Sequence, residues 1–330
     1  MTSDSGEVVL SPPRTFVYIR KGDNMDILGQ LFNALPGSVS QGLIWGIMAI
    51  GVYITYRILD VADLTVDGSF ATGGVVAVIL ILNGCNLWLA MLIAFIAGML
   101  TGAITGLLHT LMGIPPILAG ILTQLALYSI NLKLLGKANQ SVNVNQTDLL
   151  ISLRWVRDLA FRNPLITVGI VLLVMVGILY WFFGTEMGCA LRATGANLNM
   201  SRAQGINTSF NKVLGIMLSN GLVAFSGAFL AQYQGFADVK MGQGAIVIGL
   251  AAVIIGEAVF GKIFKNFALR LIGVALGSII YYIVVQTVIT LGLDANLLKL
   301  LSAAIVAIFL AIPYWKKQYM EKHIGRARRG

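Results

Sequence analysis

The chain has 330 residues, of which 57% are hydrophobic and only 11% are charged. A soluble domain carries about 25% charged residues, so this composition excludes an ordinary soluble protein and indicates a membrane protein. The 23 basic residues outnumber the 14 acidic ones, and much of the excess lies in residues 314–330, directly after the last apolar segment. A basic tail in that place favours a cytoplasmic anchor on anionic lipid over a nucleic-acid site.

Polar residues occupy the start of the chain, up to residue 37. We expect this stretch to be disordered or external, and it is either a true extension or the product of a start codon upstream of Met25. Apolar segments of bilayer-compatible length then follow one another. The sequence therefore predicts an all-α polytopic membrane domain, residues 38–313. Its expected helices, about nine in number, are residues 38–59, 70–82, 87–109, 115–135, 164–183, 213–233, 245–260, 267–291 and 296–313.

Positive charge orients these predicted helices. The tail at 314–330, the turn at 261–265 and the polar stretch 184–212 are all basic, and all three would lie in the cytoplasm. An odd number of spans then puts the N-terminus and the long loop 136–163 outside. Apolar residues alternate with arginines in the second half of that loop, Leu149–Arg162, which predicts an amphipathic helix at the membrane surface.

The third predicted helix carries Gly98, Gly102 and Gly106 at helical spacing. Small residues allow another helix to approach closely, so this stripe is a predicted helix-packing site. The cysteines, Cys85 and Cys189, fall in loops on opposite sides of the membrane, and we expect no disulfide between them.

Two polar interruptions, Asp60–Ser69 and Gln234–Gly244, break the apolar pattern. A shift of 175 residues (238 − 63) places the dipeptide Ala62-Asp63 on Ala237-Asp238; chance matching among apolar residues is the alternative explanation for the neighbouring matches. An odd number of spans separates the copies, which predicts an inverted-topology repeat of residues 38–135 and 213–313. In transporters such interruptions lie near the solute path. The candidate path residues are Asp63, Thr65, Asp67, Ser69, Asp238 and Gln243.

Carboxylates inside a membrane are costly, at about 2.5–3.5 kcal/mol each at a helix centre. Asp60, Asp63 and Asp67 could contact a solute or a gate, relay protons, or lie at a wet interface. The sequence leaves these alternatives open. We expect Glu257 to reach the inner surface or to pair with Lys262.

The most polar part of the chain lies between the predicted helices 164–183 and 213–233. We expect Gly195 and Gly205 each to end a short helix in the left-handed conformation, and Asn197 to cap the second helix. The sequence thus predicts a compact helix–turn–helix outside the bilayer.

The residue order in this stretch is Gly188-x-x-x-Arg192-Ala-Thr-Gly195-x-Asn197, followed by Ala203-x-Gly205-Ile206-Asn207. It resembles the cytoplasmic coupling loop of ABC-importer permeases of the branched-chain amino acid and ribose type. The resemblance extends from about Ser38 to Tyr314, and it departs from the pattern at Cys189, where such loops often carry a basic residue, and at Met200-Ser201. It implies a type II-like importer permease fold whose loop docks on an ATP-binding subunit. The docking residues it implies are Glu186, Arg192, Ala193, Thr194, Gly195, Asn197, Asn199, Arg202, Ala203, Gly205 and Ile206.

The resemblance also implies partners. Two copies of the chain would form a path for a small solute, delivered by an external solute-binding protein; an amino acid is favoured, and a sugar or related solute is the alternative. Each copy would bind one ATP-binding subunit, which holds the ATP and Mg²⁺, so this chain would carry no cofactor of its own. It would be a non-catalytic subunit in the bacterial plasma membrane, in contact with lipid and not with nucleic acid.

The residues themselves offer little for catalysis. The sequence has no His, Cys and carboxylate cluster at metal-binding spacing and no serine in a nucleophile-elbow pattern. Residues 256–263 match a phosphate-binding loop until Ile263, which replaces the magnesium-binding Ser or Thr. Nucleotide binding is therefore expected on another subunit.

One other function fits the composition. A secondary transporter could couple solute uptake to protons through Asp60, Asp63 and Asp67, together with Glu257. Such a carrier would have no need of an ordered docking loop, so that loop favours the importer.

Overall fold

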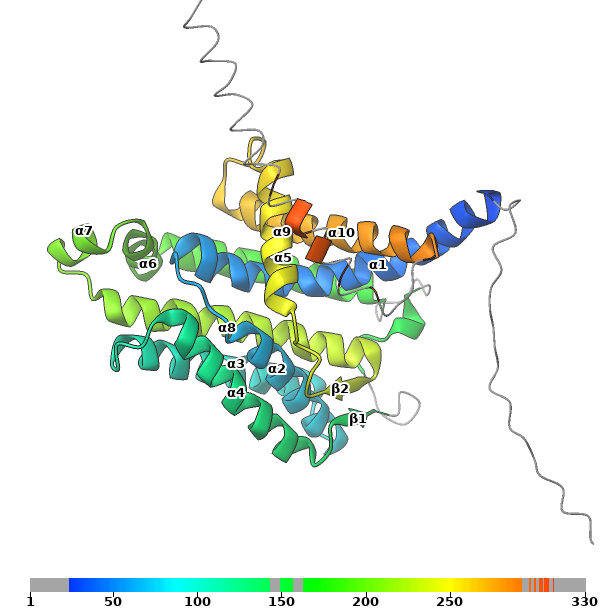
Figure 1. Cartoon of the computed structure of the whole chain (residues 1–330), viewed down its shortest axis with the longest axis horizontal. Coiled ribbons are helices and arrows are strands. Elements are labelled where there is room, and N and C mark those ends of the chain that lie inside the picture. The colour runs from blue at the N-terminus through cyan, green and yellow to red at the C-terminus, as the bar shows by residue number, and fades with distance from the viewer. Residues whose placement is uncertain are drawn as a thin grey trace, which may run out of the picture.

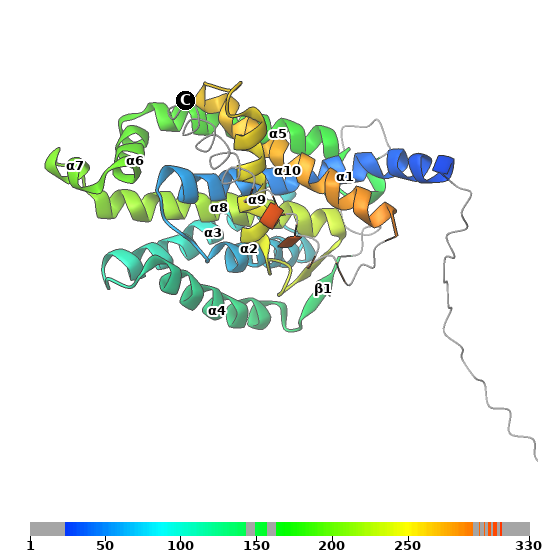
Figure 2. The same ribbon diagram turned by 45° about the horizontal axis from the view of Figure 1, so that its top comes forward.

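The computed structural model describes residues 24–142, 149–156 and 163–292, together with single positions between 297 and 311. Helices α1 and α8 pack against each other along the long axis of the molecule, with α2, α3 and α4 on one side of this pair and α9 and α10 on the other (Figure 1). The turned view shows the same arrangement, with α6 and α7 at one end and the β1 strand near the other (Figure 2). The elements are α1 (Asn24–Tyr53), the π-helix η1 (Ile54–Ile58), α2 (Val66–Leu82), α3 (Leu87–Thr110), α4 (Pro116–Leu135), β1 (Asn139–Ser141), the 3-10 helix η2 (Leu153–Trp155), α5 (Pro164–Gly184), α6 (Glu186–Ala196), α7 (Leu198–Ala203), α8 (Thr208–Gln234), β2 (Phe236–Asp238), α9 (Ala245–Phe260) and α10 (Phe267–Thr290).

Six of these helices are long and apolar enough to cross a membrane: α1 with η1, α3, α4, α5, α8 and α10. Helices α2 and α9 are apolar but shorter. Large hydrophobic side chains such as Leu100, Leu125 and Leu173 are exposed on the outer helices, where lipid would cover them. The chain is therefore a multi-pass membrane protein.

The first helix corrects one predicted boundary, because α1 begins at Asn24 and not at Ser38. Ile27, Leu28, Leu31, Phe32 and Leu35 recur at helical spacing, and this amphipathic pattern accounts for the earlier start. Pro36 lies inside the helix. Residues 1–23 and 312–330 fall outside the described residues, as does most of the predicted last span, 296–313.

The loop after α4 also departs from expectation. In the described part of Leu149–Arg162, residues 149–156, the chain forms only the 3-10 turn η2 and no amphipathic α-helix. Leu149 and Ile151 are fully buried, and the Leu150 amide donates to Gln232 Oε1 at 3.1 Å. These residues pack onto the protein instead of onto the membrane surface. Nearby, β1 pairs antiparallel with β2, so that Asn139 lies opposite Asp238.

Helices α1 and α8 run antiparallel and are joined by three side-chain hydrogen bonds, of which the longest runs from Tyr233 Oη to the Gly37 carbonyl at 3.3 Å. Ser226 Oγ donates to the Ile44 carbonyl and Ser219 Oγ to the Gly51 carbonyl, each at 2.7 Å. Hydroxyls that bond a neighbouring helix's backbone hold two apolar helices in register.

The glycine stripe of α3 faces α8. A side chain at Gly102 would stand 2.8 Å from the Met217 Cα, and one at Gly106 would stand 2.9 Å from the Val213 Cα. At Gly98 it would overlap the Asn220 carbonyl oxygen. Only glycine allows the two backbones to approach this closely.

The first interruption separates η1 from α2. Helix η1 ends at Ile58, and Asp60 adopts the left-handed conformation with φ of 54°, which aspartate tolerates better than most residues. Helix α2 then begins at Val66, so Asp67 and Ser69 belong to its first turn and not to the irregular segment. The second interruption runs through β2 to Gly244, which precedes α9.

Candidate functional site

At one end of the bundle, α6, α7 and α8 follow one another almost without loops. Thr185 precedes α6, and its hydroxyl donates to the Phe182 carbonyl at 2.6 Å. Asn197 caps α7 by accepting the Met200 amide at 3.0 Å, and Asn207 caps α8 by accepting the Phe210 amide at 3.0 Å. The predicted cap at Asn197 is therefore confirmed. Gly205, just beyond α7, has the expected left-handed conformation with φ of 77°.

The prediction that Gly195 ends a helix in the left-handed conformation was wrong. It lies inside α6 and does not end that helix. Its α-carbon packs directly on the end of η1: a Cβ there would overlap the Ile58 carbonyl oxygen and would lie 2.9 Å from the Leu59 Cα. The glycine is therefore needed for close approach of two backbones and not for a turn.

Arg192 crosses from α6 to the membrane helices. Its Nη2 donates to the Phe183 carbonyl at 2.8 Å and lies 3.3 Å from Cys189 Sγ. The guanidinium carbon stands 6.0 Å from the centre of the Phe267 ring, within the range of a cation–π contact. These contacts tie α6 to the end of α5 and to the start of α10.

Most of the predicted docking residues lie on the surface. Ala193, Gly195 and Ile206 are partly exposed. Thr194 is buried, and its hydroxyl accepts from Asn211 Nδ2 at 3.2 Å, so it holds α6 to α8 and faces away from solvent. The exposed members are Glu186, Arg192, Asn197, Asn199, Arg202, Ala203 and Gly205.

The sequence prediction missed two exposed apolar residues on α7. Leu198 is 36% exposed and Met200 is 65% exposed, although they lie outside the helices of bilayer length. Apolar side chains exposed away from the helices of bilayer length are available for contact with another protein. Their position in a strongly polar stretch was the signal that could have found them.

The first interruption is held by a network of buried polar side chains. Asp63 Oδ1 accepts the Thr65 amide at 2.9 Å, and Oδ2 accepts from Asn220 Nδ2 at 2.6 Å. Ser69 Oγ donates to Asn220 Oδ1 at 2.6 Å and lies 2.7 Å from Thr101 Oγ1. Thr65, a further candidate path residue, lies 2.7 Å from Thr105 Oγ1. Asp63, Thr65 and Ser69 are therefore brought together among α2, α3 and α8, with their polar atoms paired.

The other candidate path residues lie elsewhere. Asp67 is partly exposed and caps α9: its Oδ2 accepts the Gly244 amide and its Oδ1 the Ile246 amide, each at 2.9 Å. A carboxylate at that position also interacts favourably with the helix dipole. Asp238 accepts the Lys240 amide at 2.6 Å, and Gln243 is exposed.

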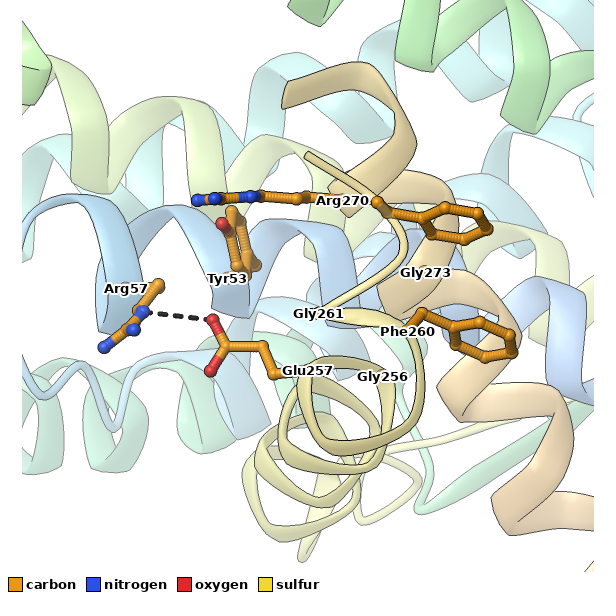
Figure 3. A pocket seen from close by; sticks show the side chains of 9 residues that line it. Tyr53, Arg57, Gly256, Glu257, Phe260, Gly261, Arg270 and Gly273 are labelled. Carbon is orange, nitrogen blue, oxygen red and sulfur yellow. Dashed lines mark ion pairs between the residues drawn. The ribbon is translucent and has the colours of Figure 1, made fainter. Parts of the chain in front are cut away.

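A pocket of about 230 Å³ opens between η1, α9 and α10 (Figure 3). Arg57 Nε pairs with Glu257 Oε1 at 3.0 Å. Of the two alternatives expected for Glu257, pairing with Lys262 is therefore wrong. Arg270 extends from α10 toward Tyr53 (Figure 3). Among the described residues, no group of three or more His, Cys, Asp or Glu side chains could hold a metal ion.

These features define a class of protein. The protein has apolar helices of bilayer length, interrupted helices at the centre of the bundle and a two-helix segment at one end, as expected of a membrane transport permease. Over residues 35–311 the chain matches the family described as the permease component of the branched-chain amino acid transport system. The chain belongs to this family.

Curated relatives agree with this assignment. The chain is 37% identical over 273 residues to a tyrosine transport system permease protein of Clostridioides difficile, which covers 83% of this chain and 89% of the relative. It is 27% identical to a fructose import permease of Bifidobacterium longum, covering 81% and 73% of the two chains. It is 23% identical to the ribose import permease of Escherichia coli, covering 88% and 87%. No solved structure matches the chain.

Proposed function

We propose that this chain is the permease subunit of an ATP-driven importer, in which two copies form the solute path and each binds one ATP-binding subunit through α6 and α7. An external solute-binding protein delivers the solute, and ATP and Mg²⁺ are held by the ATP-binding subunit. The chain itself carries out no catalysis. We also propose that α6, α7 and the C-terminus lie in the cytoplasm of a bacterial cell.

One observation carries this proposal: α6 is packed directly against the end of η1, which continues the first membrane helix. Gly195 contacts the backbone of Ile58 and Leu59, while Arg192 bonds to the end of α5 and stacks on the start of α10. A push on α6 would therefore move three membrane helices at once. The exposed apolar residues Leu198 and Met200 of α7 supply the contact surface for a partner.

An inverted repeat and about nine spans belong to the same proposal, and the α1–α8 contacts support the repeat. The pair Ile44–Ser226 becomes the pair Ser219–Gly51 when each position moves by 175 residues (219 − 44 = 226 − 51 = 175). Asp63 and Asp238 differ by the same offset, and each accepts the amide two residues later. Such symmetry is expected when two copies cross about a pseudo-two-fold axis.

The solute is proposed to be an amino acid, and an aromatic one in particular. The support is the similarity to the tyrosine transport permease, which at 37% identity exceeds that to the sugar permeases at 27% and 23%. The boundaries of the domains follow from the same assignment: a membrane domain through residue 313, with a basic cytoplasmic tail after it.

The proton-coupled carrier has less support. Both carboxylate oxygens of Asp63 accept hydrogen bonds, and Asp67 caps α9. These carboxylates have structural partners, whereas the rigid α6–α7 loop has no role in a carrier of that kind.

The experiment is a docking test on α7. Met200→Glu places a charge in the proposed contact surface without touching the core, because the side chain is 65% exposed. We expect the variant to fold normally and to lose co-purification with the ATP-binding subunit and solute-stimulated ATP hydrolysis. Met112→Glu is the matched control, since Met112 is 67% exposed in the turn between α3 and α4.

A transport assay on Met200→Glu and Asp63→Asn distinguishes the importer from the proton-coupled carrier. If Met200→Glu transports normally while Asp63→Asn abolishes an uptake that depends on protons and needs no ATP, the importer proposal is wrong.

A further inference from the structure

We propose that the cleft between α6, η1 and the start of α10 binds the phosphate headgroup of an anionic phospholipid. The cleft has a volume of about 540 Å³ and lies behind α6, on the side that faces the membrane helices. We call it the basic cleft; the charged residues that line it are Arg57, Arg192, Lys265 and Arg270.

Charge is the first argument for an anion. Four cationic side chains line the basic cleft, and no carboxylate does. Glu257, which lines the neighbouring pocket, pairs with Arg57. Arg192, Lys265 and Arg270 are left without a carboxylate partner among the described residues. Like charges gathered in one cleft repel one another, and a bound phosphate would relieve that repulsion.

The backbone adds to this attraction. Helix α10 is 24 residues long and begins at Phe267, and Lys265, Asn266 and Phe267 at its start all line the cleft. The N-terminus of a helix presents free amides and a partial positive charge, which favour a phosphate.

Position is the argument for a lipid. The cleft lies where η1 ends, α5 ends and α10 begins, at the level where spanning helices leave the bilayer. A second cleft of about 540 Å³ adjoins it: the two share Arg192, Asn266 and Phe267, and the second is otherwise lined by the aromatic end of α5 and by Thr185.

The aromatic cleft suits the remainder of a phospholipid. Trp181 is 72% exposed and Tyr180 is 50% exposed, and these residue types gather at the membrane–water interface. Basic pockets between membrane helices bind anionic headgroups, while acyl chains follow the adjacent apolar surface. A free phosphate would fill the basic cleft alone, whereas a phospholipid would occupy both.

The bound headgroup would have a mechanical consequence that rests on the proposed function. It would bridge Arg192 on α6 to Arg270 on α10 and to Lys265 in the turn before α10, and so stiffen the contact between α6 and the membrane helices. Lipid binding itself needs no ATP-binding subunit, so it is tested on the permease alone.

The test uses full-length protein, purified in mild detergent and stripped of lipid. Native mass spectrometry would measure binding of phosphatidylglycerol and of phosphatidylcholine with the same acyl chains. Glycerol 3-phosphate and inorganic phosphate serve as soluble probes of the basic cleft. We expect preferential binding of phosphatidylglycerol and no comparable binding of the soluble anions.

Lys265→Gln is the informative variant. It should weaken phosphatidylglycerol binding about five-fold, which corresponds to about 1 kcal/mol per basic residue at an anionic surface. Lys262→Gln is its matched control, because Lys262 lies in the same exposed turn and does not line the cleft. Unchanged thermal unfolding of both variants without lipid would show that folding is intact.

Several results would overturn the proposal. They are equal binding of the two phospholipids, equal loss in Lys262→Gln and Lys265→Gln, or phosphate binding as tight as that of the lipid. A fourth is unaltered lipid binding together with weaker association of Lys265→Gln with the ATP-binding subunit, which would assign the cleft to acidic side chains of that partner. Failure of the docking test at Met200 would leave the lipid measurements standing.

Discussion

Replacing Gly195 by alanine tests whether α6, the proposed coupling helix, is packed directly on the end of the first membrane helix. A Cβ at this position would lie 2.7 Å from the Ile58 carbonyl carbon and 2.9 Å from the Leu59 Cα, and it would overlap the Ile58 carbonyl oxygen. Carbon atoms in contact normally stand about 3.5–4.0 Å apart. Because the atoms in the way are backbone, α6 and η1 would have to separate by on the order of 1 Å.

The sign of the change in stability shows whether Gly195 is an ordinary helical glycine or one that close packing requires. In a helix interior, Gly→Ala alone stabilises by about 0.5–1 kcal/mol. Overpacking costs about 1–3 kcal/mol. We therefore expect Gly195→Ala to destabilise the protein by about 1–2 kcal/mol in net terms, and Gly195→Val to do so more strongly.

The assay has two readouts and a control. Thermal unfolding in detergent measures stability, and solute-stimulated ATP hydrolysis in the reconstituted complex measures coupling, which should fall in Gly195→Ala. Gly184→Ala is the control, because no atom lies within 4 Å of a Cβ built there and it terminates α5 beside the same loop. A Gly195→Ala protein that unfolds at a higher temperature and couples normally would refute the close-packing argument.

Three further predictions concern topology, packing and capping. Cys85 should react with a membrane-impermeant thiol reagent in intact cells, while Cys189, exposed on α6, should react only after permeabilisation; labelling of Cys189 in sealed cells would contradict the proposed orientation. Gly102→Leu should lower the yield of folded protein because it would separate α3 from α8, whereas Gly177→Leu on α5, where a Cβ meets no atom within 4 Å, should be tolerated; equal yields would mean that the stripe carries no packing. Asp67→Asn should lower stability by about 1–2 kcal/mol, since it leaves one of the two amides at the start of α9 without its carboxylate acceptor. Asp238→Asn should lower the unfolding temperature less, because Asp238 accepts only an amide of its own turn. A larger loss in Asp238→Asn than in Asp67→Asn would contradict the capping of α9 by Asp67.

Local patterns were sufficient for much of this molecule. The lengths of the apolar runs set the spanning helices, because an α-helix needs about 20 apolar residues to cross a bilayer. The cap at Asn197 and the left-handed Gly205 could be predicted because both depend on groups a few residues away. The glycines of α3 could be recognised as a packing stripe by their spacing, but the sequence did not say which helix they face.

Tertiary structure decided what depends on residues far apart in the chain. Gly195 was expected to end a helix, and its actual role depends on the backbone of Ile58 and Leu59, more than a hundred positions away. The same is true of Glu257, which pairs with Arg57, and of Asp67, which caps α9. Composition and spacing report which groups are available. Which partner each one meets is set by how the helices cross, because the crossing decides which groups from distant parts of the chain come within bonding distance of one another.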